Sequence, residues 1–208
     1  MIKRRVFVDD GKVKKELSIF PWNKIEVDVI TFSGMGEPTL AKNLGGAASY
    51  AKKFGLPLTI LTNSSLFSYE DVKQDLQFID WIVAKLDAPD DEIFKKINRP
   101  HEKIKFDEMV DAIKDVAAKD RKFSLQMMFV EENKEYAEDM ASLAREIKAE
   151  EVQINTPLRK SPVRPLNKED LLKIEEEFSG LNTINVYSSP KTKVTPLNYK
   201  EMKRRRPE

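Results

Sequence analysis

Short apolar runs rich in branched residues alternate with charged amphipathic stretches along this chain, at a spacing of about thirty residues. This alternation is typical of βα units. Most of the runs are almost wholly apolar, which favours strands that are buried on both faces. The predicted strands cover residues 27–32, 58–61, 81–86, 123–130 and 152–155, with a weaker strand at 183–187.

The stretches between these runs have the spacing of amphipathic helices and end at residues that cap or stop helices. The predicted helices cover residues 44–54, 69–78, 91–97, 106–118, 134–149 and 168–178. Parallel strands joined by right-handed helical crossovers leave a doubly wound sheet, a closed barrel or an open barrel as the alternatives. No linker or shift in composition divides the chain, so we expect one α/β domain over residues 1–190 and a basic tail over residues 191–208.

The composition excludes several kinds of site, because the 208 residues include no cysteine and carry a formal net charge of +1. The chain cannot hold a disulfide framework, a thiolate zinc site, a thiol nucleophile or a cysteine-ligated cluster. No segment has the apolar length of a signal peptide or a membrane span, so we expect a cytoplasmic protein without a membrane partner. The near-neutral charge gives no overall field for nucleic acid, and only residues 203–206 are locally basic.

Polar residues follow each of the first five predicted strands. In parallel α/β folds the ligand site lies at the carboxyl ends of the strands, so these segments meet at one mouth. A single polar tip is usually a solvated turn, but five together indicate a binding site. The segments are residues 33–39, 62–65, 87–90, 131–133 and 155–159.

The first of these segments places two glycines, Gly34 and Gly36, directly before Glu37 and Pro38. Paired glycines permit unusual backbone angles and let a ligand approach the main chain closely. Glu37 before Pro38 is poorly placed to begin a helix, and a buried carboxylate without a partner is costly. We therefore expect Glu37 to face water or a cation such as a ligand ammonium group, whereas a phosphate would be repelled. An ordinary glycine turn is the alternative.

Several ordered segments together resemble the radical S-adenosylmethionine (SAM) superfamily. Residues 30–40, reading Ile-Thr-Phe-Ser-Gly-Met-Gly-Glu-Pro-Thr-Leu, resemble its glycine-glycine-glutamate region. Residues 61–65 and 85–88 look like later strand ends, and residues 153–159 resemble the sixth strand of a group of iron-sulfur oxidoreductases in that superfamily. The Leu-Asp-Ala-Pro at residues 86–89 is also similar to the radical enzyme that forms the tricyclic base of wybutosine in transfer RNA.

The resemblance implies a partial (β/α) barrel of parallel strands, with the first strand of the family absent. It implies S-adenosylmethionine and a 4Fe-4S cluster as the cofactors of the parent enzyme. Gly34, Gly36 and Glu37 match the motif that contacts the methionyl amino group, and Asn63 and Asp87 match polar positions along the methionyl and ribose parts. Met128 and Asn155 fall on strands that flank the adenine.

The departure from the family is the missing Cys-x-x-x-Cys-x-x-Cys loop, whose three thiolates bind the cluster. Iron-sulfur clusters need soft thiolate ligands, and one histidine with scattered carboxylates is no substitute. We therefore expect a fragment of a radical SAM iron-sulfur enzyme, with the first strand and the cysteine loop cut away, that is inactive by itself toward an unknown substrate. The alternatives are a natural cluster-free relative acting as a ligand- or RNA-binding module, and a metal-free aldolase or isomerase that uses Lys85 and Glu37.

Three further residues or segments carry expectations of their own. Lys85 lies inside an apolar strand and is expected to pair with Asp87 or to extend outward. His101, the one histidine of the chain, is expected in a loop or capping role. Loss of the first strand would leave residues 27–32 as an exposed parallel edge, which favours dimerisation through that strand.

Overall fold

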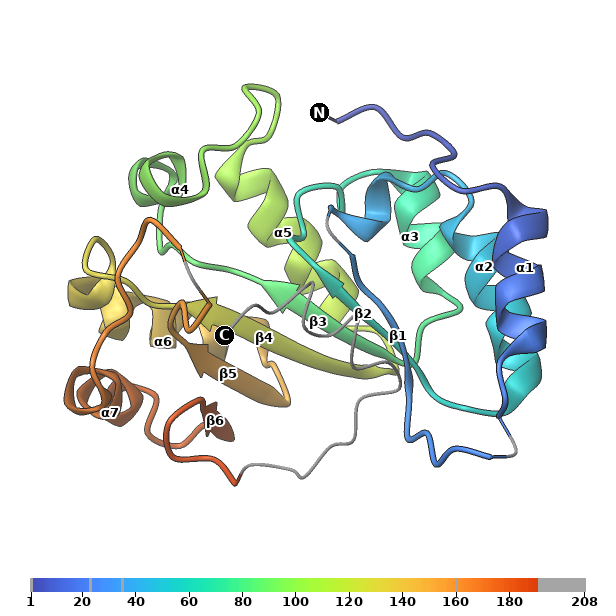
Figure 1. Ribbon diagram of the computed structural model, residues 1–208. Coiled ribbons are helices and arrows are strands. Elements are labelled where there is room, and N and C mark those ends of the chain that lie inside the picture. Colours follow the sequence, from blue (N-terminus) through green and yellow to red (C-terminus); the bar gives the residue numbers. More distant parts are fainter. Residues whose placement is uncertain (1, 23, 35, 160, 191–208) are drawn as a thin grey trace.

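The protein is an open barrel of parallel strands, each joined to the next by a helical crossover (Figure 1). The computed structural model describes residues 2–22, 24–34, 36–159 and 161–190. Its six-stranded sheet has the order β1-β2-β3-β4-β5-β6, and every neighbouring pair is parallel. The strands are β1 (Ile30–Phe32), β2 (Leu58–Thr62), β3 (Trp81–Lys85), β4 (Lys122–Met128), β5 (Glu151–Asn155) and β6 (Thr183–Asn185).

The sequential strand order decides between the architectures that the sequence left open. A doubly wound sheet reverses direction at a switch point and carries helices on both faces, whereas crossovers that always advance by one strand put the helices on one face. The order rises from β1 to β6 without reversal, and β1 does not pair with β6. The predicted class, an α/β partial barrel of parallel strands, is confirmed, and the sheet is not closed.

Seven α-helices occupy the described residues, and the longer ones carry an apolar stripe toward the sheet. In α5, the side chains of Met109, Val110 and Ile113 are buried, and α6 buries Met140, Ala144 and Ile147 in the same way. The helices are α1 (Asp10–Ile19), α2 (Leu44–Ala51), α3 (Glu70–Leu76), α4 (Asp91–Asn98), α5 (Phe106–Ala117), α6 (Ala137–Ile147) and α7 (Lys168–Glu177), with 3₁₀ turns at η1 (Pro38–Leu40), η2 (Lys52–Phe54) and η3 (Lys134–Tyr136).

Two elements differ from their prediction. Helix α1 was not predicted, because its charged sequence buries no residue and so has no apolar stripe to reveal it. The first strand was predicted over residues 27–32, but it pairs with β2 only from Ile30 to Phe32. The edge that the sequence analysis expected to be exposed is therefore half as long as predicted.

The main core lies between the helices and one face of the sheet. Ile60, Ile82 and Leu125 point toward the helices and are fully buried. On the opposite face Leu61 is 37% exposed and Gln126 is only half-buried. The expectation that the strands are buried on both faces is therefore wrong for this concave face, which carries polar side chains and remains open.

The N-terminal segment is fixed to the fold by Arg4, whose side chain is almost buried. Its guanidinium donates to the carbonyl oxygens of Thr39 and Ala41, both at 2.8 Å, and pairs with Asp71 at 2.6 Å and with Asp75. Burial alone would lower the pKa of Arg4, but the hydrogen bonds and charges of Asp75 and Asp71 outweigh it and raise that pKa above its ordinary value. Arg4 thereby ties η1 and the residue that follows it to helix α3.

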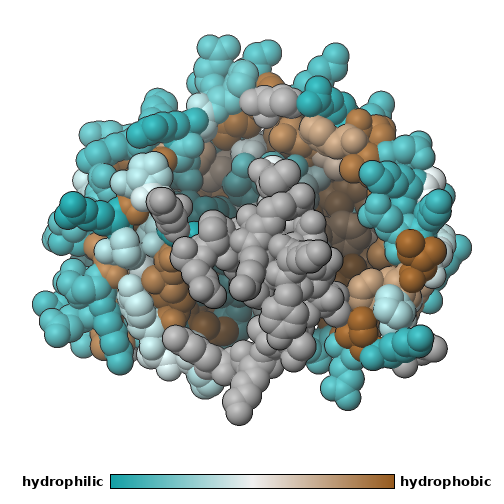
Figure 2. All heavy atoms as spheres, in the orientation of Figure 1, coloured by the Kyte–Doolittle hydropathy of each residue, from teal (hydrophilic) through white to brown (hydrophobic). Residues whose placement is uncertain are grey.

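Hydrophilic residues gather around the rim of the face seen in Figure 2, and apolar residues lie nearer its middle. Among the helices of the described residues, none combines the length and the apolar character needed to cross a membrane. The predicted basic tail, residues 191–208, lies outside the described residues.

Candidate functional site

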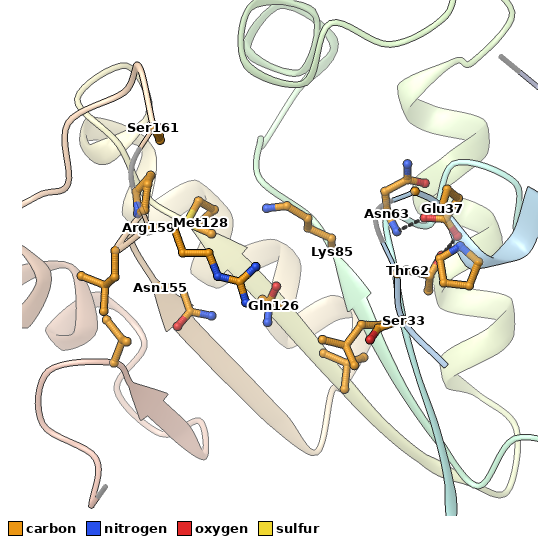
Figure 3. A pocket seen from close by; sticks show the side chains of 18 of the residues that line it. Ser33, Glu37, Thr62, Asn63, Lys85, Gln126, Met128, Asn155, Arg159 and Ser161 are labelled. Carbon is orange, nitrogen blue, oxygen red and sulfur yellow. Dashed lines mark hydrogen bonds between the residues drawn. The ribbon is translucent and has the colours of Figure 1, made fainter. Parts of the chain in front are cut away.

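A cavity of about 1110 Å³ opens at the carboxyl ends of the strands, between the glycine loop after β1 and the loop after β5 (Figure 3). Specific small-molecule sites usually measure roughly 300–1,000 Å³, so this cavity is large enough for a cofactor and part of a second molecule. The structure brings together six of the seven predicted site residues on its wall. These are Gly34, Gly36, Glu37, Asn63, Met128 and Asn155.

The two glycines do not need their special backbone freedom here. Gly55 and Gly180 have positive φ angles, whereas Gly34 and Gly36 do not. A Cβ atom added to Gly36 would meet nothing within 4 Å, and one added to Gly34 would approach only the amide nitrogen of Gly36, at 3.9 Å. What the glycines provide is empty space over the main chain, on the side where a ligand would approach.

Glu37 is anchored on the cavity wall by donors of its own chain. Its Oε1 atom accepts from the amide and the hydroxyl of Thr39, at 3.0 and 2.7 Å, and from the hydroxyl of Thr62 at 2.6 Å. Its Oε2 atom accepts from the amide of Asn63 at 2.7 Å. Glu37 also caps η1, with Pro38 in the first position, where proline is favoured.

This arrangement corrects one expectation about Glu37. The residue does begin a helix, a short 3₁₀ turn, because its side chain satisfies the free amide of that turn. Neutral donors of the protein surround most of the carboxylate, which lies on the cavity wall, and a ligand cation beside it stays a prediction. Oε2 has one protein donor among the described residues and retains the capacity to accept from a ligand.

Asn63 lies at a strained point at the end of β2. Its Oδ1 atom accepts from the amide and hydroxyl of Ser65, at 3.1 and 2.7 Å. Ser64 between them is buried and has a φ of 65°, a left-handed conformation that non-glycine residues seldom adopt. Ser64 is held there by its hydroxyl, which donates to the carbonyl oxygen of Lys85 at 3.2 Å.

Asp87, the seventh predicted residue, does not line the cavity. It is buried, and its carboxylate accepts from the ammonium of Lys85 at 2.7 Å, from the side chain of Asn98 at 2.8 Å and from the amide of Met128 at 2.9 Å. Asn133 completes the network by donating to the carbonyl oxygens of Asp87 and Met128, at 2.8 and 2.9 Å. The network joins the ends of β3 and β4, and so fixes the middle of the cavity wall.

Lys85 extends from β3 into the cavity and is 31% exposed, with its ammonium on Asp87 (Figure 3). The expected pairing with Asp87 is therefore confirmed. A Schiff-base aldolase requires a lysine amine that is free to attack a carbonyl carbon, whereas this amine is engaged by the Asp87 carboxylate at 2.7 Å. The contact gives no support to the aldolase alternative and leaves Lys85 as a hydrogen-bond donor on the cavity wall.

The two neighbouring methionines of β4 have different environments. Met127 is fully buried in the core, whereas Met128 is half-buried and lines the cavity beside Asn155, its register partner on β5. His101 is exposed in the loop after α4, and its Nδ1 atom accepts from the amide of Lys103 at 3.3 Å. This local contact confirms the loop role expected for His101.

Several residues of the site were not predicted individually. Gln126 on β4 and Arg159 after β5 line the cavity, and Thr62 and Asn133 hold its wall. Arg159 lies in one of the polar tips noted in the sequence, and Gln126 is a polar residue inside an otherwise apolar strand. That interruption was the available signal, because a polar residue in a buried strand must face either a partner or a cavity.

Metal binding has no support in the described ranges, which bring together no group of three or more histidine, cysteine, aspartate or glutamate side chains able to hold an ion. The polar groups on the wall are carboxylate, amide, hydroxyl, ammonium and guanidinium groups. These groups suit a polar organic ligand. They do not suit an iron-sulfur cluster, which requires thiolates.

Comparison with known sequences identifies the family. The pattern of the Radical SAM superfamily matches residues 2–144. A UPF0026 protein of Synechocystis sp. is 36% identical over 165 residues, or 77% of this chain, and a UPF0026 protein of Methanocaldococcus jannaschii is 30% identical over 199 residues, or 89% of this chain. This chain spans 61% of the length of each of these two relatives.

Solved structures share the fold at low sequence identity. SuiB of Streptococcus suis bound to S-adenosylmethionine has a TM-score of 0.66 and 15% identity, covering 87% of this chain and 44% of SuiB. An archaeal TYW1 has a TM-score of 0.63 and 16% identity, covering 88% of this chain and 67% of TYW1. Together with the sequence match over residues 2–144, these likenesses show that the chain belongs to the radical SAM superfamily.

Proposed function

We propose that this chain forms the part of a radical SAM enzyme that holds S-adenosylmethionine, at the carboxyl ends of β1 to β5. S-Adenosylmethionine, when bound, supplies the carbon–sulfur bond whose reductive cleavage begins radical chemistry in this superfamily. The substrate of the whole protein is a separate question, because this chain spans 61% of the first curated relatives.

The observation that carries the proposal is the carboxylate of Glu37, anchored at the edge of a cavity with one oxygen still able to accept. The methionyl ammonium group would donate to Oε2, opposite the amide of Asn63. The open space above Gly34 and Gly36 would admit the methionyl chain close to the backbone. Lys85, on β3, would meet the methionyl carboxylate, since β2 and β3 lie about 5 Å apart.

The adenosyl part would extend along the mouth toward β4 and β5. Met128 would pack against the adenine, because a thioether makes favourable contacts with aromatic rings. Asn155 would offer an amide to its polar edge. Asp87 would not contact S-adenosylmethionine itself. It would position Lys85 and the backbone of Met128, both of which donate hydrogen bonds to its carboxylate.

The cluster does not fit the residues present. The 208 residues contain no cysteine, so the thiolates that bind a 4Fe-4S cluster are not in this chain. We therefore propose that this chain alone binds S-adenosylmethionine without cleaving it reductively. The cluster ligands of the active enzyme would lie on polypeptide outside these residues.

Isothermal titration of the purified chain with S-adenosylmethionine tests the binding proposal. The substitution Glu37→Gln should weaken binding by about tenfold, the loss of one charge-assisted hydrogen bond. Glu175→Gln is the matched control, because Glu175 also accepts internal hydrogen bonds, from Thr183 and Asn185, but lies outside the cavity. Equal affinities for wild type and Glu37→Gln, with both folded, would overturn the proposal.

A second experiment addresses the whole protein. A chain extended upstream by its genomic sequence should bind a cluster after anaerobic reconstitution with iron and sulfide, and should then cleave S-adenosylmethionine when reduced. The present chain, treated identically, should show neither cluster absorbance nor cleavage. An extended chain without cluster absorbance would contradict this assignment.

A further inference from the structure

The far end of the cavity, beside β4 and β5, carries a second set of polar groups that point into it. The guanidinium of Arg159 lies over the ends of these strands and is directed toward Gln126, with Asn155 nearby (Figure 3). Gln126 and Asn155 lie on neighbouring strands, two residues apart in register. Three planar donor groups therefore converge from β4, from β5 and from the loop that follows β5.

These groups have unused hydrogen-bonding capacity. Within the described parts of the chain, the side chains of Arg159 and Asn155 make no hydrogen bond or ion pair, and Gln126 uses only its amide nitrogen, on Gln153 at 3.1 Å. Two other arginines are occupied: Arg4 binds two carboxylates and two carbonyl oxygens, and Arg145 binds two carbonyl oxygens. An arginine that faces a cavity without an acidic partner is suited to a ligand anion.

The backbone holds Arg159 at the mouth. The loop that carries it begins at Thr156 and returns at Leu166, where the amide of Leu166 donates to the hydroxyl of Thr156 at 2.9 Å. The hydroxyl of Tyr187 donates to the carbonyl oxygen of Leu166, also at 2.9 Å. These two bonds hold Leu166 beside Thr156 and so keep the ends of the loop that carries Arg159 at the mouth of the cavity.

This end of the cavity is far from Glu37. The carboxylate of Glu37 is bound at the end of β2, and Arg159 follows β5, three strands away. Three strand spacings amount to roughly 14 Å. A methionyl carboxylate whose neighbouring ammonium group binds Glu37 would lie closer to Lys85, on the strand next to β2, than to the strand that carries Arg159. Among the described residues that line the cavity, Glu37 is the only carboxylate, so no acidic side chain at the β5 end would repel an anion.

We propose that Arg159, assisted by Gln126 and Asn155, binds an oxyanion of the substrate, a phosphate or a carboxylate group. The guanidinium offers two parallel N–H donors, which match two oxygens of either group. This inference rests on the proposed function, because it assigns the other end of the cavity to S-adenosylmethionine. It makes the substrate an anionic molecule that enters between the β5 loop and the cofactor.

Titration of the full chain with pyrophosphate and, separately, with succinate tests the site, each with and without saturating S-adenosylmethionine. The two probes distinguish a phosphate from a carboxylate ligand. Arg159→Gln should weaken binding of the preferred probe by at least tenfold and leave the affinity for S-adenosylmethionine within about twofold. Arg164→Gln is the matched control, because Arg164 is exposed on the same loop but does not line the cavity, and it should bind like wild type.

Each other outcome is decisive. If Arg159→Gln weakens S-adenosylmethionine as strongly as the anion, Arg159 belongs to the cofactor site and the inference is wrong. Absence of anion binding to the wild type, or equal losses in Arg159→Gln and Arg164→Gln, also overturns it. Anion binding that depends on Arg159 in a chain that does not bind S-adenosylmethionine would sustain the anion site and refute the proposed cofactor function.

Discussion

The amide of Asn63 donates a 2.7 Å hydrogen bond to the Oε2 atom of Glu37. This bond joins the end of β2 to the glycine loop that follows β1, across 26 residues of sequence. The same carboxylate also accepts a hydrogen bond from the hydroxyl of Thr62, the last residue of β2. Two consecutive residues, Thr62 and Asn63, therefore fix the glycine loop relative to the sheet. The position of the cavity edge therefore depends on hydrogen bonds that can be removed one at a time.

Thr62→Val should destabilise the fold by about 1.5–3 kcal/mol, because it keeps the shape of a buried side chain but removes a hydroxyl that donates to the charged Glu37 and accepts from the buried amide of Ser64. It should also weaken S-adenosylmethionine binding, since Glu37 loses one of its anchors. Urea unfolding and isothermal titration measure the two effects. Thr183→Val is the control: it breaks a similar bond, to Glu175 at 2.9 Å, and should affect stability alone.

Asp87→Asn should cost about 3 kcal/mol or more of unfolding free energy, because it leaves the Lys85 ammonium without its counter-charge beside a buried group. Denaturant unfolding gives this value. The exposed pair Asp91–Lys95 on α4 provides the comparison, and Lys95→Ala should cost less than about 0.5 kcal/mol. Similar losses of unfolding free energy in the two variants would show that the buried pair contributes no more to stability than the exposed pair.

Arg4→Lys should loosen the N-terminal segment without unfolding the barrel. Lysine keeps the charge but cannot serve Thr39, Ala41 and the two carboxylates together, because it lacks the planar fork of donors. Hydrogen exchange should become faster at residues 4–5 and 39–42, while β3 and β4 remain protected. Uniformly faster exchange over the whole sheet would instead indicate that Arg4 supports global stability.

Stability should fall in acid partly through Asp80. Burial raises the pKa of this carboxyl group, but the hydrogen bonds of Lys52 and the Leu58 amide and the charges of Lys52 and Arg121 outweigh it and hold the pKa below its ordinary value of 3.8. The contribution of Asp80 is therefore present above that value and lost as the pH falls through the lower, folded-state pKa. Since the Asp80 side chain is 43% exposed, the contribution should be below about 1 kcal/mol.

Asp80→Asn tests this pH dependence. The variant should be slightly less stable than wild type at neutral pH, and the difference should vanish as the pH falls through the lowered folded-state pKa of Asp80. Thermal unfolding across this range measures it. A difference that does not change with pH would assign the effect to packing and not to the charge.

The edge strand β1 leads to a prediction about assembly. Its outer edge pairs with no strand of the described residues, and Thr31 in its centre is exposed. We expect weak, concentration-dependent dimerisation through this edge, limited by its three-residue length. Thr31→Lys should reduce it, as measured by analytical ultracentrifugation. A monomer at every concentration would contradict the prediction.

The repeat of apolar runs was enough to predict the parallel sheet and six of the seven α-helices within the described residues, because each run buries one face under a helix. The missing helix, α1, buries no side chain, so periodicity could not reveal it. Its signal was local: Asp9 accepts from the amide of Gly11 at 2.8 Å, as an N-cap before a run of strong helix formers. Capping residues predict helices that hydrophobic patterns miss.

The candidate site was predictable as a set of strand tips, but not in its internal contacts. The sequence places Glu37 and Asp87 at two tips and gives no sign that one faces the cavity while the other is enclosed by Lys85, Asn98 and Met128. That difference arises from donors distant in sequence, such as Asn98 on α4. The direction of Arg159 toward Gln126, seen in Figure 3, likewise has no signal in the sequence.

Because every crossover advances by a single strand, the cavity wall and the polypeptide are collinear: moving around the mouth from β1 to β5 also moves from the amino to the carboxyl terminus. Each part of the cavity wall is therefore formed by one continuous stretch of the sequence. Chimeras that exchange the segment after β4 with that of a relative would replace the Arg159 sector and retain the Glu37 sector.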